Sequence, residues 1–255
     1  MTRVAACQIS LDIENPAQNI ARANKAIADA ISQGGQIIVL PELTNSGYVF
    51  TSVAEVQERS TTLDGEPIGR WKEIAHQNDV LIIAGLALSV DSRLYNASVV
   101  IDRTGLLGWY AKVHLFGEEH QFFKTGEKPP LVVNTAHGRI ATMVCYDVEF
   151  PEWVRLAMLD RAALLAVPTN WPNLGQLIHG TAMEAVRVQA AASVNKMVAV
   201  AADRSGPERG HSWVSSSVIT DFEGNIKAIA HRESEDDVQV CENNDLALEG
   251  AWELE

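Results

Sequence analysis

The sequence predicts a single α/β domain, because apolar strand-like runs alternate with helical patterns along most of its 255 residues. Hairpin signals interrupt this alternation: DRTG at 102–105 and DFEGN at 221–225 each separate two strand-like runs. Hairpins join antiparallel strands, so a purely parallel, doubly wound sheet does not fit. No Pro/Ser-rich linker divides the chain. We therefore expect one domain over 1–235 and an acidic tail over 236–255, which is either an extended arm or partly disordered.

The N-terminal segments show the alternation of strand and helix clearly. Residues 2–10 form an apolar run typical of a buried strand. The residues that follow predict a helix, with Asn15 as its N-cap, Pro16 at its first position and Gly34 just past its end. The apolar run QIIVLPE at 36–42 predicts the next strand.

The remaining elements are predicted from the same two periodicities and from the turn residues at their ends. Helices are expected at 68–79, 151–162 and 180–195. Strands are expected at 80–90, 94–102, 106–116, 138–147, 163–168 and 196–203, and a hairpin over 211–230.

Charge and composition exclude several classes of function. The net charge of -13, with no Lys/Arg-rich run to offset it, argues against a nucleic-acid or membrane-surface partner. The cysteines Cys7, Cys145 and Cys241 are far apart, so they form neither a zinc pattern nor a disulfide framework. No stretch approaches the length of an apolar membrane span. We expect a cytoplasmic protein.

Cys145 lies where an apolar strand gives way to a helix, in the stretch IATMVCYDVEFPEWVR at 140–155. Free cysteines are commonly inert core residues, and burial alone could explain this one. The flanking Tyr146, Asp147 and Glu149 instead favour an elbow between strand and helix. Such an elbow can expose a nucleophile while the next backbone N–H binds an oxyanion. On this residue alone, both interpretations stay open.

A catalytic thiol needs a base, because a thiol with an ordinary pKa of about 8.5 is only slightly ionised at neutral pH. Glu42 ends the apolar run at 36–42, where it is either a base or an ordinary strand-end or helix-capping residue. Lys112 interrupts the apolar and aromatic segment 106–116, where it either stabilises an oxyanion or is an edge-strand lysine. Neither residue decides the chemistry singly.

Three motifs, taken together and in order, are specific. VLPELTNSGY at 39–48, YAKVHLFGEEHQFFKTGE at 110–127 and VCYDVEFPE at 144–152 closely resemble the signatures of the nitrilase superfamily, the carbon–nitrogen hydrolases with a Glu–Lys–Cys triad. Later segments, among them VPTNWP at 167–172, follow the family's order, so that the resemblance covers roughly residues 3–230. It implies an αββα sandwich that pairs with a second subunit into a four-layer homodimer or a larger homo-oligomer.

The resemblance also implies a role for each triad residue. Cys145 would attack the substrate carbonyl carbon, and Glu42 would take the thiol proton and later activate water. Lys112 and the backbone N–H of Tyr146 would hold the oxyanion. This chemistry requires no metal and no cofactor.

Several further site residues follow from the same motifs. A second glutamate in the loop after the lysine would orient the lysine and the substrate. Glu119 fits that position best, and the adjacent Glu118 is a weaker candidate. Tyr48, Asn170 and Trp171 lie on segments that border the pocket in similar proteins, where packing is an equally good explanation for all three.

The chain departs from the common family pattern at a few positions. Glu149 stands where an arginine often precedes FPE, Met143 replaces a frequent glycine, and Asp203 replaces an asparagine before RSG. Because Glu149 lies close to the nucleophile in sequence, we expect its charge to disfavour substrates that carry a nearby carboxylate.

The nucleophile motif favours one branch of the family. Nitrilases typically have Cys-Trp-Glu, whereas this chain has Cys145-Tyr146-Asp147. We predict a cysteine-dependent amidase that hydrolyses small aliphatic amides to carboxylic acid and ammonia through a thioester. The alternatives are an N-carbamoyl amine or amino-acid amidohydrolase, a nitrilase, or a catalytically silent binding member of the fold. A thiol protease would instead depend on a histidine such as His114 or His120.

Overall fold

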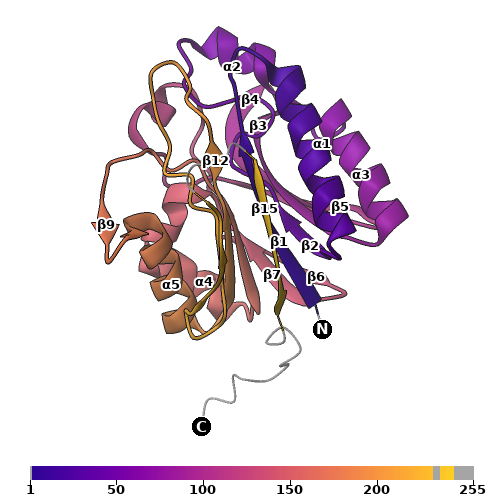
Figure 1. The fold of residues 1–255 in the computed structure, drawn as a ribbon. Helices are drawn as coiled ribbons and strands as arrows, with labels where there is room; N and C mark the ends of the chain where they lie inside the picture. The colour runs from indigo at the N-terminus through magenta and orange to yellow at the C-terminus, as the bar shows by residue number, and fades with distance from the viewer. Residues whose placement is uncertain (1, 232–235, 244–255) are drawn as a thin grey trace.

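The computed structural model describes residues 2–231 and 236–243, and it shows two stacked β-sheets with helices on their outer faces (Figure 1). Apolar clusters fill the space between the first sheet and its helices, between the two sheets, and between the second sheet and its helices. Because a sheet covered on both faces needs apolar residues on both, the strands read as continuous apolar runs. The expected αββα sandwich is therefore confirmed.

The first sheet has the strand order β12-β1-β2-β3-β4-β5, with β15 also paired to β1. The strands β1, β2 and β3 are parallel, whereas β3, β4 and β5 form antiparallel hairpins. The hairpin predicted at 102–105 joins β4 to β5. The strands are β1 (Thr2–Ser10), β2 (Ile37–Val39), β3 (Leu81–Val90), β4 (Arg93–Asp102), β5 (Gly105–Ala111), β12 (Arg204–Ser205) and β15 (Asp237–Asn243).

The second sheet has the strand order β14-β13-β11-β8-β7-β6. Its central strands β7, β8 and β11 are parallel, and the predicted C-terminal hairpin forms the antiparallel pair β13 and β14. A separate short hairpin pairs β9 with β10. The strands are β6 (Leu131–Thr135), β7 (Gly138–Thr142), β8 (Leu164–Pro168), β9 (Leu177–Ile178), β10 (Thr181–Ala182), β11 (Val198–Ala202), β13 (Val218–Thr220) and β14 (Ile226–Ile229).

Helices α1 (Pro16–Ser32) and α3 (Glu66–Asn78) cover the first sheet, and α4 (Pro151–Leu159) and α5 (Met183–Asn195) cover the second (Figure 1). Helix α1 begins at the predicted proline, but the side chain of Asn15 donates to Asp12 instead of capping the helix. The sequence patterns missed α2 (Val53–Arg59), a short helix in a connection. None of the helices in the described ranges is long and apolar enough to cross a membrane.

The acidic tail predicted for residues 236–255 lies only partly within the described residues. Its first part forms β15, which runs antiparallel along β1 from the pair Gln8–Asp237 to the pair Thr2–Asn243. Residues 244–255 lie outside the described part. The division at residue 235 stays a prediction.

Three strands end just before a residue of the predicted triad. β2 ends at Val39, β5 at Ala111 and β7 at Thr142. The strand predicted over 106–116 is therefore shorter than expected, because the chain leaves the sheet at Lys112. The strand predicted over 138–147 is likewise shorter, because residues Cys145–Glu149 form the 3-10 turn η2.

Gly85 on β3 allows the backbone near Glu42 to approach the sheet closely. A Cβ atom at this position would collide with Cα of Glu42 and lie 2.6 Å from the carbonyl oxygen of Pro41. We predict that Gly85→Ala lowers the free energy of unfolding by about 1–3 kcal/mol, because backbone atoms cannot yield as a flexible side chain can. Chemical denaturation measures this change.

Gly69 on α3 provides the matched control, because a Cβ atom there meets nothing within 4 Å. Gly69→Ala should leave stability unchanged or raise it by up to about 1 kcal/mol, since alanine favours the helix. Equal stabilities for the two variants would contradict the close approach at Gly85.

Candidate active site

A fully buried lysine lies between two carboxylates at the centre of the site. The Lys112 ammonium donates to Oε1 of Glu42 at 2.7 Å and to Oε1 of Glu119 at 2.8 Å. Lys112 and Glu42 are 0% exposed and Glu119 is 4% exposed. An ammonium ion buried without partners would cost several kcal/mol, and the two carboxylates compensate for its lost water. The structure thus brings together three of the predicted catalytic residues.

Asn96 on β4 connects Glu42 to Lys112. Its side-chain amide donates to Oε1 of Glu42 at 2.6 Å, and its backbone oxygen accepts the Lys112 N–H at 2.8 Å. The backbone N–H of Glu42 in turn donates to Thr169, which follows β8 in the other sheet. Residues from both sheets therefore fix Glu42, and Asn96 of the first sheet also fixes the backbone of Lys112. Asn96 escaped the sequence analysis, although a polar residue inside the apolar run 94–102 was a detectable signal.

The 3-10 turn η1 (Gly117–Gln121) places Glu119, and not Glu118, on the lysine. The carboxylate of Glu119 accepts the Tyr48 hydroxyl at 2.5 Å through Oε1 and the Phe116 N–H at 3.3 Å through Oε2. Glu118, by contrast, is exposed. The choice of Glu119 over its neighbour therefore agrees with the observed geometry.

Cys145 occupies a tight turn between β7 and α4. Its backbone φ of +47° lies in the left-handed region, which a non-glycine residue adopts at a cost of about 1–3 kcal/mol. The side chain is 5% exposed, and its Sγ lies 3.9 Å from the carbonyl oxygen of Asn170. The elbow expected between strand and helix is present, and it holds the thiol in one direction.

Asp147 ties the nucleophile turn to the loop that follows Lys112. Its Oδ2 accepts the N–H of Val144 at 3.1 Å and the hydroxyl of Tyr110 at 2.9 Å. Its Oδ1 accepts the backbone N–H of His114 at 2.9 Å and lies 2.7 Å from the ring nitrogen of the same residue. The ring of His114 also stacks on Phe150 at 3.7 Å. The turn at Cys145 and the loop after Lys112 are thereby anchored to one buried carboxylate.

The charges in the site follow from burial and contact. Burial raises the pKa of Glu42 to about 7, although Lys112 acts in the opposite direction. Burial alone would lower the pKa of Lys112, but the charges of Glu119 and Glu42 raise it well above its ordinary value. Burial, and then the charge of Glu42, raise the pKa of the Cys145 thiol. At neutral pH the site therefore holds a charged lysine, a neutral thiol and a glutamate close to its own titration point.

The remaining predicted pocket residues surround the thiol unequally. Asn170 places its backbone oxygen on Cys145, and both polar atoms of its buried side chain lack a hydrogen-bond partner among the described residues. The Tyr146 ring contacts Phe116, with 5.2 Å between centroids. Trp171 is buried, and its backbone N–H donates to Asp203. The unpaired amide of Asn170 makes it the best substrate-binding candidate of this group.

Glu208 is a further buried carboxylate to which the sequence analysis gave no role. Its Oε1 accepts Arg204 Nη1 at 3.0 Å, and its Oε2 accepts the backbone N–H groups of Tyr48 and Val49 at 2.8 and 2.7 Å. It thus fixes the loop that carries Tyr48. Glu208 ends the stretch RSGPE at 204–208, which lies within the part of the chain that resembles the family. The sequence does not show its contacts, which become visible only in the fold.

Two of the three departures from the family pattern, Asp203 and Glu149, have polar partners in the structure. The Asp203 carboxylate accepts backbone N–H groups of Trp171, Arg204 and Ser216, although burial raises its pKa to about 7. Glu149 forms an ion pair with Arg187 on α5 at 2.9 Å. The expectation that Glu149 disfavours substrates with a nearby carboxylate stays a prediction, and the ion pair with Arg187 offsets part of the negative charge on which it rests.

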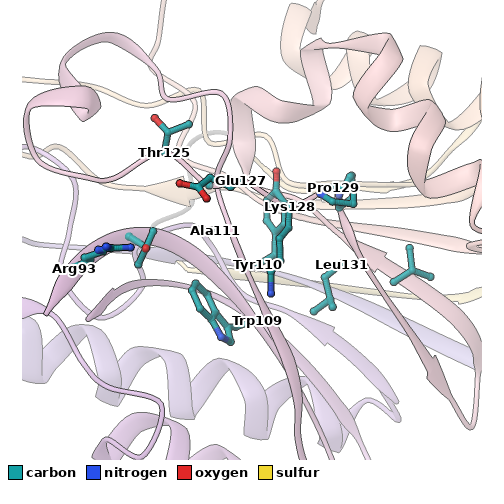
Figure 2. A pocket seen from close by; sticks show the side chains of 13 residues that line it. Arg93, Trp109, Tyr110, Ala111, Thr125, Glu127, Lys128, Pro129 and Leu131 are labelled. Carbon is teal, nitrogen blue, oxygen red and sulfur yellow. The ribbon is translucent and has the colours of Figure 1, made fainter. Parts of the chain in front are cut away.

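Two cavities lie near these residues. One, of about 280 Å³, has walls from the loop around Tyr48, from η1 and from Trp213, and Glu119 lines it. The other, of about 410 Å³, lies between β5 and β6, where Trp109 and Leu131 face it (Figure 2). None of the predicted site residues lines the second cavity. Across residues 2–231 and 236–243, no group of His, Cys, Asp and Glu side chains could hold a metal ion.

The site and the fold have counterparts in known proteins. A nitrilase of Pyrococcus abyssi is 35% identical over 243 residues, which cover 95% of this chain and 89% of the relative. The 2-oxoglutaramate amidase of Bacillus subtilis is 28% identical over 90% of this chain and 86% of its own length. The amidase of Nesterenkonia sp. AN1 superposes with a TM-score of 0.81 at 28% identity, over 96% of this chain and 94% of that one. Another structure of that amidase shows the acetamide moiety of fluoroacetamide added covalently at its active-site cysteine.

The sequence profile of carbon–nitrogen hydrolases matches residues 3–247, nearly the whole chain. This match is consistent with the two-sheet sandwich, with the buried cysteine at the elbow and with the similarity to the proteins above. The chain therefore belongs to the carbon–nitrogen hydrolase family of the nitrilase superfamily, whose members hydrolyse carbon–nitrogen bonds other than peptide bonds.

Proposed function

We propose that this hydrolase acts on small aliphatic amides, with Cys145 as nucleophile, Glu42 as general base and Lys112 as the oxyanion partner. The observation that carries the proposal is the buried contact of Lys112 with Glu42 and Glu119, close to the cysteine turn. Amidases among the relatives support the substrate class. The Cys145-Tyr146-Asp147 motif also differs from the Cys-Trp-Glu motif typical of nitrilases.

The first half of the reaction forms a thioester. The Cys145 sulfur bonds to the amide carbon while its proton passes to Glu42, and the carbonyl oxygen becomes an oxyanion. The Lys112 ammonium and the N–H of Tyr146 stabilise that oxyanion in a site shielded from water. When the carbon–nitrogen bond breaks, the nitrogen takes the proton from Glu42 and leaves as ammonia.

The second half hydrolyses the thioester. Water attacks the acyl carbon as Glu42 accepts its proton, and the oxyanion forms again at the same place. Cleavage of the carbon–sulfur bond releases the carboxylic acid, and the thiol regains its proton from Glu42. Glu119 keeps Lys112 charged and oriented through both halves, and Tyr48 holds Glu119.

Ammonia release from a panel of aliphatic amides, N-carbamoyl amines and nitriles tests the proposal. We predict that the wild-type protein turns over aliphatic amides best and that Cys145→Ala lowers the rate by roughly 1,000-fold or more. If a carbamoyl amine or a nitrile were the best substrate, the proposed specificity for aliphatic amides would be wrong. Equal rates for wild type and variant would contradict the nucleophile assignment.

The pH dependence tests the role of Glu42 separately. Its carboxylate must be ionised to accept the thiol proton, so kcat/KM should fall as the pH drops through about 7. The hydrogen bond from Asn96 stabilises the ionised form and lowers the pKa. We predict that Asn96→Ala moves this acidic limb upward by about one pH unit, measured from kcat/KM profiles.

Asn19→Ala is the control for that variant. Asn19 on α1 is equally buried, but its side chain bonds to the backbone of Asp12, far from the triad in sequence. Its substitution should cost stability without moving the acidic limb. A limb that stays in place in Asn96→Ala would contradict Glu42 as the titrating base.

We further propose that the protein forms a homodimer through the outer faces of α4 and α5. Leu159 on α4 and Val194 on α5 are 64% and 71% exposed. A charge placed in an apolar interface opposes association, so Val194→Lys should shift the protein toward the monomer in light scattering after size-exclusion chromatography.

Val53 on α2 offers a matched substitution, because it is 51% exposed on a different helix. Val53→Lys should leave the dimer intact. Dissociation by both variants, or by neither, would exclude the α4–α5 face as the specific interface.

A further inference from the structure

The cavity of about 280 Å³ shares part of its wall with the active site. Tyr48 and Glu119 line it, and these two residues reach Lys112 through the hydrogen bonds Tyr48 to Glu119 and Lys112 to Glu119. Phe116 lines it as well, and its ring contacts Tyr146, the residue after the nucleophile. Glu119 therefore connects the cavity wall to Lys112, and Phe116 connects it to the nucleophile turn.

Any part of an amide substrate that entered this cavity would belong to its acyl side. If the substrate is a primary amide, as proposed above, the leaving group is ammonia. Every other atom beyond the reacting amide then belongs to the acyl group. If the acyl group extends into this cavity, the side chains of the cavity wall determine which carboxylic acids the enzyme can release.

Aromatic and aliphatic side chains make up most of the cavity wall. Phe50 contacts Phe122 and Phe123, with ring centroids 5.9 and 5.7 Å apart. Tyr48 meets Trp213 edge to face at 5.2 Å. The other lining residues are Leu43, Val49, Phe116, Gly117, Glu118, Glu119, Pro172 and His211. Such a wall binds apolar groups by burying their surface.

The charges at the cavity are unfavourable for an anionic acyl group. The ionisable side chains in its wall, apart from the Tyr48 phenol, are Glu118, Glu119 and His211, and no lysine or arginine lines it. The guanidinium of Arg204 lies 4.6 Å from the Trp213 ring, but it is fully buried and bound to Glu208. A substrate carboxylate would therefore lose water without meeting a lysine or arginine in the wall, and it would face Glu118 and the Lys112-bound Glu119.

We infer that this cavity is the acyl-group site and that it selects uncharged, apolar acyl chains, including aryl groups, against chains that end in a carboxylate. The inference rests on the proposed amide hydrolysis and specifies its substrate class. Glu118 is an exposed carboxylate through which the charge of the wall can be changed without touching the Lys112 contacts.

Steady-state kinetics with four primary amides tests the selection. Propionamide is the small reference, hexanamide and phenylacetamide are the apolar substrates, and glutaric acid monoamide is the anionic one. We expect kcat/KM for hexanamide and phenylacetamide to exceed that for the monoamide by roughly 100-fold or more, since an unpaired buried carboxylate costs several kcal/mol. A monoamide that reacts as well as hexanamide overturns the inference.

A charge series at one position sharpens the test. Glu118→Gln removes a negative charge with little change of shape, and Glu118→Lys replaces it with a positive one. The ratio of kcat/KM for the monoamide to that for hexanamide should rise from wild type to Glu118→Gln and again to Glu118→Lys. Because the ratio is taken within each protein, general losses of activity or folding cancel. An unchanged ratio across the series contradicts the placement of the acyl chain in this cavity.

Binding separates failure of this inference from failure of the proposed function. Calorimetry on the Cys145→Ala variant measures the affinity for hexanamide and for the monoamide without turnover. Selective binding of hexanamide with no hydrolysis by the wild type would reject the amidase proposal and retain the acyl-group site. Hydrolysis of propionamide with no preference between hexanamide and the monoamide would retain the amidase proposal and reject the acyl-group site.

Discussion

The buried ammonium of Lys112 is the constraint around which the site is built. A lysine with no exposed surface remains charged only if carboxylates replace its water, and Glu42 and Glu119 do so at 2.7 and 2.8 Å. One carboxylate follows β2 and the other lies on η1, so two separate segments must meet at the end of β5. Once they meet, burial brings Glu42 to a pKa of about 7, which suits a base that must both take and return a proton.

Buried polar residues outside the triad hold these segments in register. Asn96 joins Glu42 to the backbone of Lys112, and Asp147 joins the nucleophile turn to the loop after the lysine. Glu208 fixes the backbone at Tyr48, whose hydroxyl then reaches Glu119. The carboxylates of Asp147 and Glu208 satisfy backbone N–H groups that the loops would otherwise leave unpaired. The loops can therefore be irregular in shape and still hold the catalytic groups in fixed positions.

Much of this arrangement could be predicted from the sequence. The order of strands and helices followed from periodicity, and the motifs that resemble the family predicted the αββα layers. The ends of elements were harder: the strands predicted to continue through Lys112 and Cys145 stop earlier, because the chain turns there to aim these side chains inward. The effect expected from Glu149 did not anticipate Arg187, which lies on a different helix.

The sequence by itself determined the secondary-structure order, the family and the residue types available for catalysis, because periodicity and ordered motifs are read along the chain. Only the tertiary structure decided that the Glu119 carboxylate also binds the Tyr48 hydroxyl, that Asn96 and Glu208 support the site, and that the cavity beside Glu119 has no lysine or arginine in its wall. Those properties depend on distances between segments far apart in sequence. Such distances are fixed only when the two sheets and their loops pack together.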